Sequence, residues 1–127
     1  MRRSWFIVMP FALLVEISGA QANKAEPIPW HEFKPLHGSY MIYGGGLGDP
    51  WEPTLGDASI AVSVKGSAAK AIFDQLGRDV KDDCTAGTGI RIRRRAELEC
   101  LKEKTGEYSC HFGFNLKSGK SIGGILC

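Results

Sequence analysis

The stretch that decides the fold class is IRIRRRAELECL, residues 90 to 101. From Ile90 to Cys100, apolar residues occupy one parity and arginine or glutamate occupies the other, with Arg94 as the single exception. An alternation with a period of two predicts one long β-strand, with one face toward a core and the other toward water or a partner. The sequence therefore predicts a sheet with one polar face.

The residues after this strand predict an antiparallel meander. Lys104 to Gly106 fit a three-residue hairpin loop with glycine in the left-handed position, which places Cys110 opposite Cys100. A second hairpin then places Cys127 opposite Cys110. The central strand of the three is expected at residues 107 to 115.

A strand and a short helix are expected before the meander. Residues 60 to 64 alternate between branched apolar residues and small or polar ones, as in a strand with one buried face. Ser67 is predicted to cap a helix over residues 68 to 76, and Gly77 fits the position after its end. The predicted fold class is α+β: a small single domain in which one short helix packs on an antiparallel sheet that ends in the meander.

Four cysteines predict two disulfides rather than a metal site, because zinc ligands usually come in closer pairs. The meander separates Cys100 from Cys127 by two strands, which is too far for a disulfide. Two pairings stay open. We favour Cys84–Cys100 with Cys110–Cys127, and the other is Cys84–Cys127 with Cys100–Cys110.

Residues 1–22 have the features of a secretory signal peptide. Arg2 and Arg3 precede an apolar run, and Ala20 and Ala22 supply the small residues of a cleavage site. The run is about half of the roughly 20 residues that span a bilayer, so no transmembrane segment is expected after cleavage. Export and disulfides predict a periplasmic or secreted protein.

The mature chain is predicted to have two parts. Residues 23–57 hold the mature prolines and a triple glycine, which predicts a loop-rich N-terminal segment. Residues 58–127 are expected to form the disulfide-bonded α+β core. The sequence leaves open whether the first part wraps over the core or stays a disordered lead-in.

A binding surface is predicted on the polar face of the sheet. The alternation places arginines in a row there, and their forked guanidinium groups suit carboxylates and phosphates. His111 is expected opposite Glu99 on the same face, which is either an ordinary cross-strand pair or an acid and base pair. Trp51, flanked by two prolines, is a further candidate anchor. The candidate binding residues are Arg91, Arg93, Arg95, His111 and Trp51.

The remaining patterns predict no catalytic residue, metal or cofactor. The histidines and carboxylates lack the spacing of a zinc or calcium site. The glycines at 44–46 lack the lysine of a phosphate-binding loop. A formal net charge of +2 gives no support for a nucleic-acid partner.

We therefore expect an exported, non-enzymatic binding protein, such as an inhibitor or neutraliser of another extracytoplasmic protein. Its partner would be another protein or an anionic envelope ligand. Two alternatives stay open: a small hydrolase or metal-dependent enzyme that uses His111 and Glu99, and a structural component of an envelope assembly.

Overall fold

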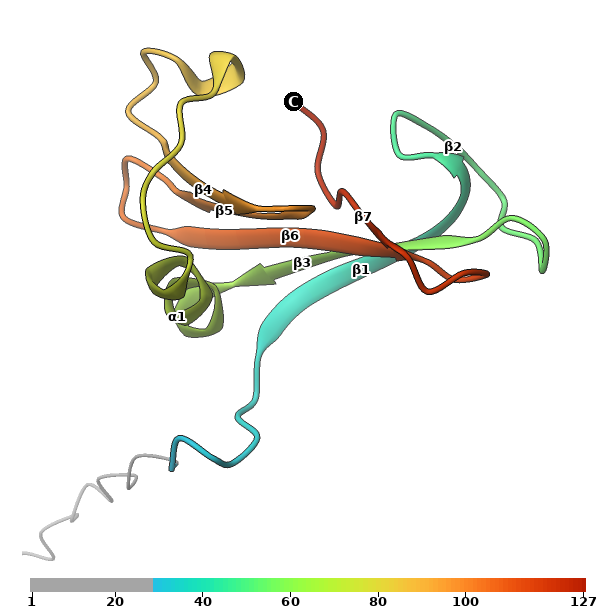
Figure 1. Cartoon of the computed structure of the whole chain (residues 1–127), viewed down its shortest axis with the longest axis horizontal. Coiled ribbons are helices and arrows are strands. Elements are labelled where there is room, and N and C mark those ends of the chain that lie inside the picture. The colour runs from blue at the N-terminus through green and yellow to red at the C-terminus, as the bar shows by residue number, and fades with distance from the viewer. Residues whose placement is uncertain (1–28) are drawn as a thin grey trace, which may run out of the picture. The chain divides into compact units, whose positions relative to one another are not determined.

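A computed structural model of the chain describes residues 29–127 (Figure 1). The predicted signal peptide and the predicted mature start at Asn23 lie outside the described residues. The chain divides into two units, residues 1–32 and residues 33–127. In the described part of the first unit, the rings of Trp30 and His31 meet edge to face at 5.3 Å. The second unit carries the fold.

The second unit is an antiparallel sheet with one helix (Figure 1). Its strand order is β2-β1-β3-β6-β5-β4, and β7 pairs with β6. The α+β prediction is confirmed, although the balance is toward sheet. None of the helices within residues 29–127 has the length and apolar composition needed to cross a membrane. The elements are β1 (His37–Gly46), β2 (Asp49–Trp51), β3 (Ser59–Lys65), α1 (Gly66–Gln75), the 3-10 helix η1 (Asp83–Thr85), β4 (Arg91–Arg95), β5 (Leu98–Lys102), β6 (Tyr108–Asn115) and β7 (Ser121–Ile122).

Helix α1 follows β3 directly and packs back on the sheet, against β6, β3 and β5. Ala69 and Phe73 lie one turn apart on its inner side and are fully buried. Gly77 has the expected left-handed conformation, with φ of 87°. The predicted cap at Ser67 is wrong: Lys65 occupies the capping position and its side chain makes no capping hydrogen bond. The left-handed Gly66, with φ of 70°, lets the chain turn from strand into helix without a linker.

The stretch 90–101 is two strands rather than one. Arg95 pairs with Leu98 across a two-residue turn, in which Ala96 adopts a left-handed φ of 49°. Residues on one face of the sheet therefore have odd numbers before this turn and even numbers after it. Arg93, for example, lies opposite Cys100 and shares its face. The sequence pattern did not indicate a turn here, because the glycine or asparagine that is usual in a two-residue hairpin turn is absent.

The predicted register between β5 and β6 is confirmed, with Cys100 opposite Cys110. The predicted register of the last hairpin is wrong, since β7 pairs Ile122 with Gly113 and ends there. Gly124 instead lies against the backbone of Phe112, where a Cβ would clash. The tail is thereby free to carry Cys127 away from β6.

The disulfides are Cys84–Cys127 and Cys100–Cys110, with Cα atoms 5.8 Å and 4.0 Å apart. The pairing that we favoured from the sequence is therefore wrong, and its alternative is found. The reason is geometric: Cys100 and Cys110 face each other directly on neighbouring strands. The tail after β7 then brings the last cysteine to the loop before β4.

The predicted loop-rich segment 23–57 contains regular structure. Strand β1 covers His37–Gly46 and pairs with β3 from His37 to Tyr43. The short β2 pairs with its last three residues. This segment therefore supplies an outer strand of the sheet, next to β3.

Candidate functional site

An uncovered apolar surface lies on the face of the sheet that carries α1. The helix packs over Val64 and Cys110, which lie opposite each other at one end of that face. Two residues further along, Val62 lies opposite both Tyr40 and Phe112, so the three side chains share this face. Figure 1 shows α1 against this end of the sheet and no other labelled helix or strand over the rest of that side.

We call this surface the open face. It is exposed because within residues 29–127 no second layer covers it: Tyr40 is 71% exposed, Ile42 45% and Phe114 41%. The rings of Phe112 and Phe114 meet edge to face at 6.1 Å. The open face consists of Tyr40 and Ile42 on β1, Ile60 and Val62 on β3, and Phe112 and Phe114 on β6.

Two of the arginines predicted to bind a partner instead bind a carboxylate of the protein itself. Arg91 and Arg93 both donate to the Asp79 carboxylate, with distances of 2.6 Å and 2.8 Å from their Nε atoms. These hydrogen bonds lower the pKa of Asp79 to about 2. Both arginines lie on the side of the sheet that carries α1, whereas Arg94 points to the other side.

Arg93 is a packing residue as much as a charge. Its guanidinium lies 4.2 Å from the centroid of the Phe73 ring and donates to the Phe73 carbonyl at 2.9 Å. Its side chain is only 16% exposed. The arginine thus closes the C-terminal end of α1. Arg95 is exposed on the same face, at the border of the sheet.

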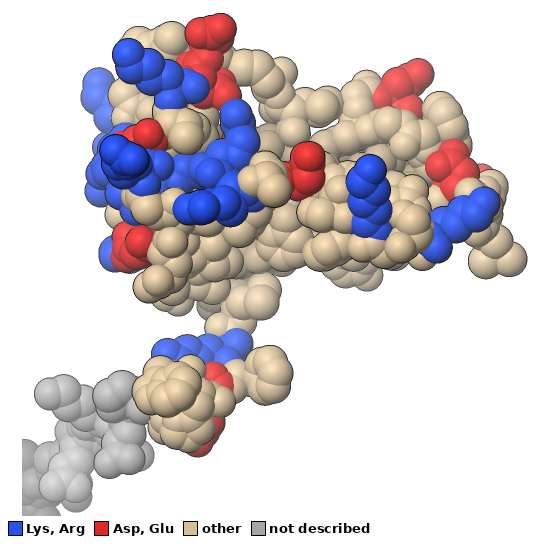
Figure 2. Space-filling model, viewed as in Figure 1, with Lys and Arg blue, Asp and Glu red and all other residues tan. Residues whose placement is uncertain are grey.

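Figure 2 shows most lysine and arginine side chains of this view at the end of the sheet that carries β4 and β5. Carboxylates are interspersed there: Asp79 pairs with both Arg91 and Arg93, and Arg94 pairs with both Asp82 and Glu99. The basic cluster is therefore a largely neutralised surface rather than a strong anion site.

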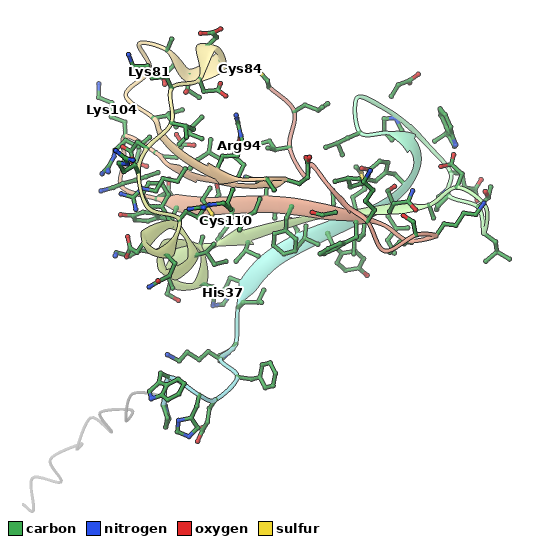
Figure 3. The ribbon with its side chains drawn as sticks, in the orientation of Figure 1. His37, Lys81, Cys84, Arg94, Lys104 and Cys110 are labelled. Atoms are coloured by element: carbon green, nitrogen blue, oxygen red, sulfur yellow. A yellow bond between two sulfur atoms is a disulfide. The ribbon has the colours of Figure 1, made fainter. Side chains whose placement is uncertain are left out.

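Arg94 points to the opposite side of the sheet from Arg93. Figure 3 shows it rising from β4 toward the loop that carries Cys84. It pairs with Asp82 at 2.7 Å and with Glu99. A cavity of about 290 Å³ lies here, between β4, β5, the 82–85 loop and the C-terminal tail. The Cys84–Cys127 disulfide forms part of its wall, so the cavity depends on that bond.

His111 lies opposite Glu99, as predicted, on the side of the sheet away from α1. Its Nε2 atom is 3.2 Å from the Ser109 hydroxyl, a neighbour that sequence reasoning missed although it precedes His111 by two residues on one strand. Burial lowers the pKa of His111, and Glu99 opposes that effect. Glu99 itself is bound by Arg94. The strand thus places an imidazole beside a hydroxyl.

Trp51 is both packed and exposed. Its ring lies against the backbone of Gly44 and Gly45, where a Cβ would clash with the indole. Its indole N–H donates to the Asp57 carboxylate at 3.1 Å, and the same oxygen accepts from the Gly45 N–H at 3.0 Å. The ring remains 56% exposed. Gly44 and Gly45 therefore leave room for the Trp51 ring to pack on the backbone, and Asp57 holds the ring there.

The structure thus separates the predicted binding residues. Arg91, Arg93 and Arg95 lie on one face of the sheet, and His111 lies on the other. Trp51 lies on β2 beyond the end of the β1 and β3 pairing. Sequence reasoning missed the open face, because the pattern of a single strand does not show how far along the sheet the helix extends.

Comparison with known proteins gives no guide to function. No family model, no curated protein and no solved structure matches this chain.

Proposed function

We propose that this protein is an exported, non-enzymatic binding protein that holds a partner protein on its open face. An inhibitor or neutraliser of another extracytoplasmic protein fits this description. The observation that carries the proposal is the exposure of Tyr40, Ile42 and Phe114 on one face of the sheet, where the half-buried Ile60 lies between Ile42 and Phe114. Contiguous apolar surface of this kind is typical of interaction sites.

Shape supports a protein partner over a small molecule. The open face is built from three adjacent strands, β1, β3 and β6, and the open residues of each lie opposite those of the next. Large side chains on such a surface offer broad contact, and tyrosine and phenylalanine are enriched at protein interfaces. The exposed Arg95 gives the border a positive charge for an acidic rim on the partner.

The two disulfides support export, because such bonds persist in oxidising compartments outside the cytoplasm. The predicted signal peptide has the same implication. The bonds would also keep a small exported domain rigid, so that binding costs little conformational entropy.

Capture of a partner tests this proposal. We would immobilise the oxidised protein, expressed as the full chain, and expose it to envelope and culture extracts of the source cells. A Tyr40→Ser/Phe114→Ser variant removes two open-face side chains, and a Leu55→Ser variant removes an exposed side chain elsewhere. A partner retained by Leu55→Ser and lost by the open-face variant supports the proposal. Equal capture by all three proteins rejects the open face.

A hydrolase is a second candidate, because the Ser109 hydroxyl and the His111 imidazole are in hydrogen-bond contact. A histidine in contact with a serine is the pairing that activates a nucleophile. Binding remains the favoured function because Glu99, the group that would orient His111, is bound to Arg94 instead. Hydrolysis of p-nitrophenyl esters that is lost in both Ser109→Ala and His111→Ala would favour the enzyme.

A further inference from the structure

The outer edge of β1 is unpaired within residues 29–127. From His37 to Tyr43 the strand pairs with β3, and its pairing with β2 is confined to Gly44–Gly46. Backbone groups of residues 37–43 that point away from β3 therefore have no strand partner in the described chain. Such an edge is a template for another strand.

Strand β1 also lacks the devices that usually protect an edge. None of its ten residues is lysine, arginine, aspartate, glutamate or proline. The residues from His37 to Ile42 are all exposed. An uncharged, exposed edge of this length favours aggregation unless something pairs with it.

The opposite edge of the sheet is protected in two ways. Four of the five residues of β4 are arginine. The Val80 N–H also donates to the Ile92 carbonyl at 2.8 Å, so the preceding loop covers part of the edge. Of these two edges, within residues 29–127, the β1 edge alone is both uncharged and uncovered.

We infer that the β1 edge pairs with β1 of a second copy of this chain, antiparallel about a two-fold axis. An isologous contact of this kind needs a patch that complements itself. Strand β1 meets that requirement, because it carries no formal charge and self-pairing sets no like charges against each other. Strand β4 would set arginines against arginines.

The dimer also extends the apolar surface. A two-fold axis perpendicular to the sheet leaves the same face of both copies on one side, so the two open faces become continuous. Tyr40 and Ile42 of each copy then lie next to the seam, where aromatic and branched cross-strand pairs are favourable. The inference does not rest on the proposed function, because it concerns the purified protein alone.

Two measurements on the purified, oxidised protein test the dimer. Light scattering coupled to gel filtration should show the mass rise from monomer to dimer with concentration. Amide hydrogen exchange should show that alternate amides within residues 37–43 exchange at least tenfold more slowly in the dimer. Alternate amides are affected because neighbouring residues of a strand point their N–H groups to opposite edges.

Proline substitutions sharpen the test. Tyr40→Pro and Met41→Pro each delete one N–H of β1, and only one of the two faces the outer edge. The variant that loses an outward N–H should keep its fold and lose the dimer, whereas the other should be destabilised. A Tyr40→Lys/Ile42→Lys variant adds edge charges without touching the backbone, and it should also be monomeric. Arg95→Ser, on the opposite edge, should dimerise normally.

Three results would overturn the inference. The first is a monomer at all concentrations up to about 1 mM. The second is a dimer in which residues 37–43 exchange as they do in the monomer, because another surface would then form the contact. The third is a monomer whose β1 amides are already protected, because another segment of the same chain would then cover the edge.

Discussion

On the face of the sheet that carries α1, both ends are lined by apolar residues, but the helix covers only one of them. At one end, Val64 and Cys110 lie under α1 and are at most 3% exposed. Two to four residues along the same strands, Ile60 and Val62 are only half-buried, and Phe114 is 41% exposed. The same alternation of apolar residues therefore continues beyond the part of the sheet that α1 covers.

This difference separates residues that stabilise the fold from residues that are exposed enough for the proposed binding role. Side chains beneath α1 are packed with Phe73 and contribute through burial. Side chains at the open end remain partly in water, so the fold gains less from them. Their apolar character is what the proposed binding role of the open face requires.

The largest effect is expected from truncating the ring beneath α1. Phe73→Ala should lower the free energy of unfolding by about 3–5 kcal/mol, because it leaves a cavity and removes the ring on which Arg93 lies. Phe114→Ala, the same change at the open end, should cost less than about 1 kcal/mol. Urea unfolding monitored by circular dichroism measures both. Equal losses would contradict the distinction between the two ends.

Removing the bond between the tail and the loop before β4 comes next. Cys84→Ser/Cys127→Ser should lower stability by about 2–4 kcal/mol, because the disulfide restricts the unfolded chain over a separation of 43 residues. Partner binding by the open face should persist wherever the variant is folded, since neither cysteine lies on that face. Loss of binding by a folded variant would show that the surface extends to the tail.

A smaller effect separates two arginines of β4. Arg93→Ala should cost about 1–2 kcal/mol, because the Phe73 carbonyl and Asp79 lose a charged donor. Arg95→Ala should change stability by less than about 0.5 kcal/mol, because that residue is exposed. The pair distinguishes a structural arginine from one available to a partner. Thermal unfolding gives the order, and the reverse order would refute these assignments.

The smallest effect is a dependence on pH. The arginines lower the pKa of Asp79 from 3.8 to about 2, so its ionised form favours the folded state. That contribution is complete above pH 4 and is lost as pH falls from about 4 to 2. Because the carboxylate is 37% exposed, we expect about 1 kcal/mol or less. Asp79→Asn should remove this part of the slope in acid unfolding, and an unchanged slope would reject the assignment.

The sequence predicted the helix, strand β3 and the β5–β6 register because each has its own local signal. Residues 68–76 have helical spacing, and Gly106 marks the hairpin. The turn at Ala96 was missed because an alanine in the left-handed conformation carries no such signal. The error reversed the faces: Arg91 and Arg93 were expected on the solvent side, and the sheet places them beside α1.

The candidate site could be predicted only in part. The position of His111 opposite Glu99 followed from the hairpin register alone. The open face required knowledge of where β1 pairs and how far α1 reaches along the sheet, and both depend on contacts between distant segments. The seating of Trp51 by Asp57 likewise depends on a contact that no local pattern reveals.

The most direct test of a binding role for the open face is hydroxyl-radical footprinting of the protein, alone and with its captured partner. We predict that Tyr40 and Phe114 lose reactivity in the complex, while Trp51 and Leu55 keep theirs. Unchanged reactivity of Tyr40 and Phe114, with protection centred on Trp51 or on the arginine strand, would contradict the proposed binding role of the open face.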